Sequence, residues 1–274
     1  MNLFQSIILG IVQGLSEFIP ISSSAHLVIV PYLLGWNIPH DQSFVFDVLV
    51  QAATLVGVFS YFWNDVVKIT RAILLGIWHR QPFADPQARL GWYLFLASIP
   101  AGLVGLAIKD TIEAAFHNTI ATALFLLVTA ILLIIAERIG KRNRPFDRIT
   151  WKDAIIIGFF QAIALFPGVS RSGSTIAGAM TRDLERPAAA RFSFLMSIPI
   201  MFAAGMVALI DLFKIPNVEH SLPIFLPGFI VAGVVGYLSI KWLLFFLSRY
   251  SLYYFAAYCV VISMITISTS MLIR

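Results

Sequence analysis

Residues 167–175 read Pro-Gly-Val-Ser-Arg-Ser-Gly-Ser-Thr and interrupt an otherwise apolar segment that runs from about 154 to 181. Residues 20–24, Pro-Ile-Ser-Ser-Ser, interrupt a similar segment of about 3–34. Inside a membrane, non-helical backbone is tolerated only where protein buries it or a watery cavity solvates it. Each segment is therefore either a poor spanning helix or a re-entrant hairpin of two half-helices.

The composition identifies the solvent of this chain as a lipid bilayer. Apolar residues make up 59% of the 274 residues and charged residues only 12%, whereas soluble domains carry roughly 25% charged residues. These values exclude a soluble globule and a disordered chain. The single cysteine, Cys259, excludes an internal disulfide and a cysteine metal cluster. The N-terminus lacks the basic region of a cleavable signal peptide, so the first apolar segment is expected to stay in the mature protein.

Six further segments are long and apolar enough to cross about 30 Å of hydrocarbon as helices. They cover about 44–63, 92–108, 119–136, 192–213, 224–247 and 252–272.

The positions of the basic residues predict the membrane topology of these segments. The net charge of +5 comes from lysines and arginines gathered in short loops, as the positive-inside rule expects, so nucleic acid is not an expected partner. The loops at 68–89 and 138–152 are basic and predicted to be cytoplasmic, whereas 109–118 and 214–222 carry one lysine each and are predicted to lie outside. A re-entrant 154–181 segment keeps Arg182, Arg186, Arg191 and Arg249 inside, so this arrangement is favoured over a spanning one.

The two broken segments also share a pattern. Each contains Gly-x-x-Gln, then Pro six or seven residues later, then Ser three residues further on (Gly10, Gln13, Pro20, Ser23; Gly158, Gln161, Pro167, Ser170). One hairpin and three spans in each half invert the second half relative to the first. The prediction is an all-α integral membrane protein, one membrane domain of two inverted repeats (1–150 and 151–274), with chance similarity between apolar segments as the competing explanation.

Glu17 and Gln13 are the candidate metal ligands. Their i, i+4 spacing places them on one face of a helix, and an ionisable residue deep in an apolar segment is a functional candidate by default. Oxygen ligands suit Mg²⁺ or Ca²⁺ rather than zinc. The alternative is a carboxylate in the headgroup region.

The run Ser22-Ser23-Ser24-Ala25-His26 follows Pro20. Serines there can cap a helix, and the N-terminus they cap also suits a phosphate. His26 lies one turn after Ser23, so the two could form a nucleophile and its base; a structural histidine is the alternative.

Arg171 is the most informative residue of the second break. Its planar, always-charged guanidinium suits phosphate, the glycines allow close backbone approach, and Ser170, Ser172 and Thr175 add hydroxyls. Pairing with a carboxylate is the alternative role for this arginine.

Both breaks resemble one known family. Gln13-Gly-Leu-Ser-Glu17, followed by Ser22-Ser23-Ser24-Ala25-His26, is similar to the (Glu/Gln)-x-x-x-Glu…Ser-Ser…His element of the undecaprenyl-diphosphate phosphatases, the bacitracin-resistance family. Residues 167–175 are similar to its Pro-Gly-x-Ser-Arg-Ser-x-x-Thr element. The resemblance covers essentially the whole chain.

The resemblance implies hydrolysis of undecaprenyl diphosphate to undecaprenyl phosphate and phosphate, which recycles the lipid carrier of cell-wall synthesis and gives bacitracin resistance. It also implies a bacterial inner-membrane protein with a site open to the outer face, a requirement for Mg²⁺ or Ca²⁺, and a polyprenyl diphosphate as partner. Whether the chain is a monomer or a homodimer is left open.

The residue roles expected on this basis divide into four groups. Catalysis is assigned to Glu17, Ser23, His26 and Arg171; phosphate binding to Ser22, Ser24, Ser170, Arg171, Ser172 and Thr175; metal binding to Glu17 and Gln13; and support around His26 to Asp47 and Gln51. The main rival function is an inverted-repeat transporter or lipid flippase without hydrolysis.

Overall fold

The computed structural model describes residues 1–108, 118–212 and 218–272. Within them the chain is all-helical, with eleven α-helices and a short 3-10 helix at Phe146–Arg148. The all-α class is confirmed. Residues 109–117 and 214–217 of the predicted outside loops lie outside the described ranges, and residues 218–222 of the second predicted loop are helical instead.

Six helices are long and apolar enough to cross a membrane, as predicted. Their ends differ from the predicted ends by up to six residues, mostly because polar first turns extend the helices beyond the apolar core. The six are α3 (His40–Tyr61), α5 (Pro86–Ala107), α7 (Thr119–Ile139), α10 (Arg186–Leu212), α11 (Val218–Leu247) and α12 (Tyr253–Leu272).

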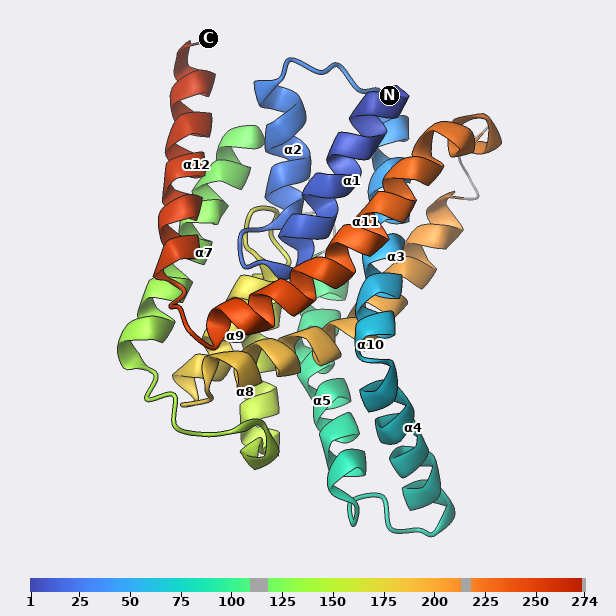
Figure 1. The fold of residues 1–274 in the computed structure, drawn as a ribbon, viewed down its shortest axis with the longest axis vertical. Coiled ribbons are helices and arrows are strands. Elements are labelled where there is room, and N and C mark those ends of the chain that lie inside the picture. The colour runs from blue at the N-terminus through green and yellow to red at the C-terminus, as the bar shows by residue number, and fades with distance from the viewer. Residues whose placement is uncertain (109–117, 213–217, 273–274) are drawn as a thin grey trace.

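Each broken segment forms two antiparallel helices joined by a short loop. The first hairpin consists of α1 (Leu3–Phe18) and α2 (Ser23–Leu33), and the second of α8 (Trp151–Ile163) and α9 (Arg171–Thr181). Figure 1 shows α1 starting at one end of the molecule and α8 at the other, with the two loops in the interior.

Local sequence explains where these helices begin. Both first helices open with a capping box, in which the N-cap side chain and the third helical residue satisfy each other's backbone N–H (Asn2 with Gln5; Thr150 with Asp153). Both second helices have a serine N-cap: the Oγ of Ser22 accepts from the N–H of Ala25, and the Oγ of Ser170 from the N–H of Gly173.

Each hairpin packs against a long helix of the other half of the chain, α1 against α11 and α8 against α5. Glycines allow both contacts. A Cβ added to Gly10 would lie 2.4 Å from the carbonyl oxygen of Gly228, and one added to Gly158 would lie 2.6 Å from that of Ala97. No side chain larger than hydrogen fits at either crossing.

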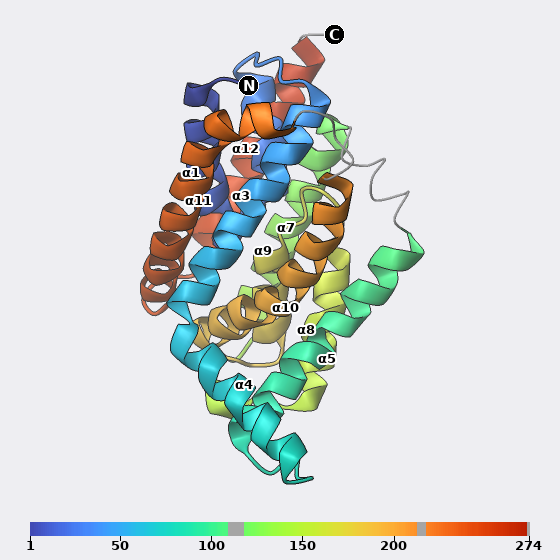
Figure 2. The ribbon, with the colours of Figure 1, turned by 90° about the vertical axis from the view of Figure 1, so that its right-hand side faces the viewer.

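Helix α4 (Trp63–Trp78) lies largely where a basic loop, 68–89, is predicted from the sequence. Its apolar residues Ile69 and Ala72 are buried, while Trp78 is 81% exposed. Figure 2 shows α4 and the start of α5 projecting together from the end of the bundle. A helix of 16 residues with two basic side chains is too short and too polar for the length test that identified the spans.

The connections α7–α8, α9–α10 and α11–α12 meet at the end of the molecule where α8 begins (Figure 1). Two buried carboxylates join them. Glu137 pairs with Arg142 and Arg186 and accepts from the N–H of Leu252, and Asp153 pairs with Arg144 and Arg182. The predicted 138–152 loop and the basic residues Arg182 and Arg186 therefore lie side by side.

Candidate active site

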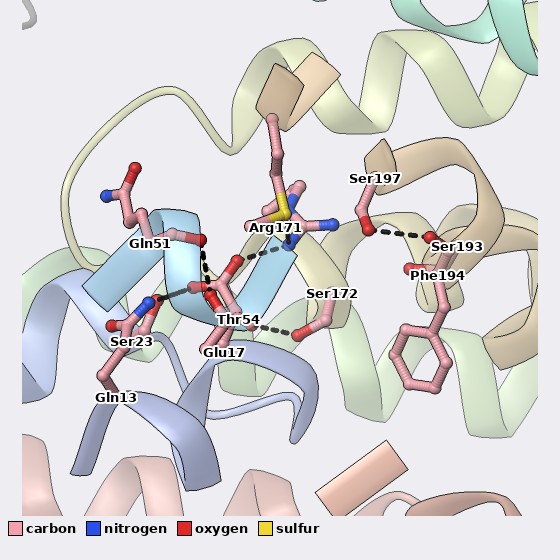
Figure 3. A network of polar contacts seen from close by, with 12 residues as sticks. Gln13, Glu17, Ser23, Gln51, Thr54, Arg171, Ser172, Ser193, Phe194 and Ser197 are labelled. Atoms are coloured by element: carbon pink, nitrogen blue, oxygen red, sulfur yellow. Dashed lines mark hydrogen bonds and ion pairs between the residues drawn. The ribbon is translucent and has the colours of Figure 1, made fainter. Parts of the chain in front are cut away.

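Glu17 and Arg171, 154 residues apart in sequence, form an ion pair where the two hairpin loops meet. Nη2 of Arg171 lies 2.5 Å from Oε1 of Glu17, and both side chains are largely buried. The other carboxylate oxygen, Oε2, accepts hydrogen bonds from Nε2 of Gln13 at 3.0 Å and Oγ of Ser23 at 2.6 Å. Figure 3 shows these groups converging on the Glu17 carboxylate.

Polar contacts hold the two loops against each other. The N–H of Gly168 donates to Oγ of Ser24, and Oγ of Ser172 donates to the carbonyl of Ile19, each at 3.3 Å. From α7, Oγ1 of Thr129 donates to the carbonyl of Gly168 and accepts from the N–H of Ser170. The second loop is thus fixed from two sides.

A cavity of about 350 Å³ lies at this meeting point. Its polar lining comes from both hairpins and from α3. The lining includes Glu17, Ser22, Ser23, Ser24, Gln51, Gln161, Ser170 and Arg171. A second cavity, of about 450 Å³ between α3, α4, α5 and α10, is lined by described residues none of which is ionisable, so it is not the candidate for ionic chemistry.

The cavity collects hydrogen-bond donors that lack partners within the described ranges. The N–H groups of Ser23 and Ser24, which begin α2, and of Arg171, which begins α9, make no hydrogen bond to these residues. Nη1 of Arg171 is buried and also unpartnered there. Two helix N-termini and a guanidinium together form a site suited to an anion with several oxygens.

Ser23 and His26, which the sequence suggests as a nucleophile and its base, do not pair with each other. Ser23 donates to Glu17. The ring of His26 instead bonds the carbonyl of Ser22 through Nδ1, at 2.7 Å, and the hydroxyl of Tyr258 through Nε2, at 2.8 Å. One helical turn places the two side chains in reach of a pair, but each has a partner elsewhere.

Four other residues do not occupy the positions that their expected roles require. Ser172 and Thr175 are buried and do not line the cavity, because Ser172 bonds Ile19 and Thr175 bonds Ser193. Asp47 and Gln51 are not among the hydrogen-bond partners of the His26 ring; Gln51 lines the cavity, and Asp47 is half-buried one turn before it. The expected support around His26 is supplied by Tyr258 instead.

Sequence reasoning missed three residues of the site. Gln161 is buried and lines the cavity, and its position matches Gln13 in the shared pattern, which was the available signal. Met201 places its Sδ 3.4 Å from Nη2 of Arg171. Nothing in the sequence pointed to Met201 or to Tyr258.

The oxygen atoms around Glu17 show whether the site could bind a divalent cation. No group of three His, Cys, Asp or Glu that could hold a metal occurs among the described residues. Oε1 of Gln13 is nevertheless a buried oxygen without a partner in this part of the chain, beside the Glu17 carboxylate. Mg²⁺ typically uses one or two carboxylates together with substrate phosphates. These residues fit a cation shared with a phosphate ligand.

Fold and site together define a multi-pass helical membrane protein with a polar cavity, lined by Glu17 and Arg171, between two helical hairpins. Residues 6–265 match the family model described as bacitracin resistance protein BacA, and the chain belongs to that family.

Three relatives are similar in sequence to this chain over nearly their whole length. The chain is 40% identical to a protein of Methanosphaera stadtmanae over 100% of both chains, and 40% identical to one of Thermomicrobium roseum over 97% of both. It is 43% identical to a protein of Chlorobaculum tepidum over 94% of this chain and 93% of the relative. All three relatives are named undecaprenyl-diphosphatase.

Proposed function

We propose that this protein hydrolyses undecaprenyl diphosphate to undecaprenyl phosphate and inorganic phosphate, recycling a lipid carrier of cell-wall synthesis and giving bacitracin resistance. One observation carries the proposal: the Glu17–Arg171 pair joins the two hairpin loops beside a cavity rich in unpartnered donors. The names of the relatives supply the substrate.

Arg171 and the two helix N-termini hold the diphosphate. Nη1 of Arg171 is free to bond a phosphate oxygen while Nη2 stays on Glu17. The unpartnered N–H groups of α2 and α9 bond further oxygens. Because phosphoryl transfer is catalysed mainly by positioning and charge stabilisation, these donors supply most of the rate enhancement.

Glu17 and Ser23 act on the attacking oxygen. The Ser23 hydroxyl already donates to Oε2 of Glu17, so this carboxylate can take the proton when an oxygen attacks the terminal phosphorus. The attacking oxygen is either Oγ of Ser23, giving a phosphoserine that water then hydrolyses, or a water that Ser23 orients. In both cases the bond between the terminal phosphorus and the bridging oxygen breaks, and undecaprenyl phosphate leaves. Trapping a phosphoenzyme separates the two routes.

Glu17 and Oε1 of Gln13 would hold a Mg²⁺ or Ca²⁺ ion together with the substrate phosphates. When bound, the cation neutralises charge on the phosphate oxygens.

We also propose an inverted repeat, with halves 1–150 and 151–274, and a site open to the outer face of the plasma membrane. The reciprocal packing of α1 on α11 and α8 on α5 supports the repeat. The basic connections gathered at one end support a cytoplasmic position for that end.

The test is phosphate release by the purified full-length chain given undecaprenyl diphosphate and Mg²⁺. We expect release that EDTA abolishes and that Glu17→Gln reduces by about a hundredfold or more. A transporter or flippase would instead show counterflow in vesicles with no release of phosphate, and that result would overturn the proposal.

A further inference from the structure

The hydrogen bonds of His26 fix its tautomer. A carbonyl oxygen can only accept, so Nδ1 must carry the proton that is donated to Ser22. Nε2 is then the acceptor for the hydroxyl of Tyr258. The two rings also stack, with centroids 5.6 Å apart and an interplanar angle of 11°. His26 is 6% exposed and is not among the residues that line the cavity.

The group that His26 holds lies in an unusual backbone conformation. Ser22 has φ 71° and ψ 100°, in the half of conformational space that favours glycine and is strained for a residue with a side chain. Its carbonyl accepts two hydrogen bonds from His26, from the backbone N–H at 3.2 Å and from Nδ1 at 2.7 Å. The side-chain bond adds to what an N-cap carbonyl normally receives.

Fixing this carbonyl also fixes the next N–H. In a trans peptide the C=O of one residue and the N–H of the next point in opposite directions, and the described chain contains no cis peptide. The Ser22 carbonyl points into α2, so the N–H of Ser23 points out of the helix at the break, where Ser23 lines the cavity. That N–H is one of the unpartnered donors.

We infer that Tyr258 and His26 are positioning residues, which lock the Ser22–Ser23 peptide so that the Ser23 N–H and hydroxyl face the phosphate. Tyr258 lies on α12, so the last helix of the chain sets the geometry of the first hairpin. The inference rests on the proposed function for the identity of the ligand. It assigns His26 a role through Ser22 rather than as a proton carrier at the reacting atoms.

Substitutions at His26 separate these roles. The amide nitrogen of Asn can occupy the place of Nδ1 and still donate to the Ser22 carbonyl, whereas that of Gln corresponds to Nε2. A positioning role therefore predicts that His26→Asn retains activity within about fivefold of wild type, while His26→Gln and His26→Ala lose about a hundredfold. A proton carrier predicts a large loss in all three variants.

Tyr258→Phe tests the hydroxyl alone. Loss of one neutral hydrogen bond is expected to lower kcat/KM about threefold to tenfold. Tyr254→Phe, one turn earlier on the same helix and 62% exposed, is the matched control and should leave kcat/KM unchanged. Thermal unfolding of each purified variant establishes that it is folded.

Binding of inorganic pyrophosphate, followed by its effect on the unfolding temperature, gives a readout independent of turnover. We expect wild type and His26→Asn to be stabilised alike, and Tyr258→Phe and His26→Gln less. Folded His26→Asn that is as inactive as His26→Ala, or Tyr258→Phe that matches Tyr254→Phe, would overturn the inference. If wild type releases no phosphate, the proposed function fails, and the binding series alone decides the positioning role.

Discussion

The two hairpins share three structural features, which we call their frame, but they differ in their loops. Both begin with a capping box, cross a long helix at a glycine and place a buried glutamine before the break. The first hairpin supplies a carboxylate, Glu17 at the end of α1, and turns through Ser22. The second supplies a guanidinium, Arg171 at the start of α9, and turns through Gly168, at φ 102°. The shared frame gives two facing helix N-termini, and the differences give the charges of opposite sign that complete one site.

The loops also differ in how their turning carbonyls are held. The Gly168 carbonyl accepts from Thr129 of a neighbouring helix, and glycine adopts its conformation without steric cost. The Ser22 carbonyl accepts from His26 of its own hairpin, which Tyr258 supports. The first loop therefore depends more on its side chains than the second.

The largest expected effect comes from removing the charge of the second loop. Arg171→Ala should lower phosphate release about a thousandfold or more, because it removes the guanidinium that holds the phosphate oxygens. Phosphate release by Arg171→Lys should lie between that of wild type and that of Arg171→Ala, since an ammonium lacks the planar fork of a guanidinium. Steady-state phosphate release with thermal unfolding as a check on folding measures this.

Arg191→Ala is the control for losing a paired arginine elsewhere. Arg191 bonds Asp65 and lies over the ring of Phe146, and it is not among the residues that line the cavity. Its removal should leave phosphate release near wild type. Arg171→Ala that keeps a tenth or more of wild-type activity would show that the second loop does not carry the chemistry.

If the two hairpin frames are equivalent, replacing the crossing glycine with alanine should destabilise the protein by a similar amount in each hairpin. Gly10→Ala and Gly158→Ala each force a Cβ against a carbonyl oxygen, and each should lower the free energy of unfolding by about 1–3 kcal/mol. Gly102→Ala on α5, where a Cβ meets nothing within 4 Å, is the control and should not destabilise. Destabilisation by only one of the two would break the equivalence.

The two hairpin frames should differ in how their stability depends on pH, because only the second has an ionisable residue, Asp153, in its capping box. Burial raises the pKa of the Asp153 carboxyl, but hydrogen bonds from Arg144, Thr150 and Arg182 outweigh it and lower the pKa to about 2. A folded-state pKa below the ordinary value of 3.8 stabilises the protein above about pH 4, and this contribution, about 2 kcal/mol, is lost as the pH falls towards 2.

Asp153→Asn should remove that part of the acid dependence, measured as unfolding temperature against pH. The first hairpin carries neutral Gln5 at the corresponding position of its capping box, so Gln5→Ala should leave the slope as in wild type. An unchanged slope in Asp153→Asn would mean that other carboxyls set the acid sensitivity.

Much of this comparison could be predicted from the sequence because it depends on local signals. Runs of apolar residues gave the six spans, and the prolines and serines of the two breaks gave the helix ends and N-caps. For Arg171 the sequence suggests pairing with a carboxylate only as the alternative to phosphate binding, and the structure shows such a pair, with Glu17 as the partner.

Contacts between distant segments could not be predicted. The pairing of His26 with Tyr258 joins residues 232 apart, and neither a periodicity nor a spacing encodes it. Ser172 and Thr175 looked like phosphate ligands because hydroxyls serve both ligand binding and packing; only the fold turns them towards Ile19 and Ser193. Helix α4 was missed because its basic residues interrupt the apolar signal.

The most direct test of the central claim, that two hairpins from opposite halves build one site, is a double-mutant cycle on phosphate release with Glu17→Gln, Arg171→Lys and the double variant. Residues that act as a unit give strongly non-additive losses. The double variant should therefore be within about threefold of the worse single variant. Losses that multiply, as for two independent sites, would contradict a shared site.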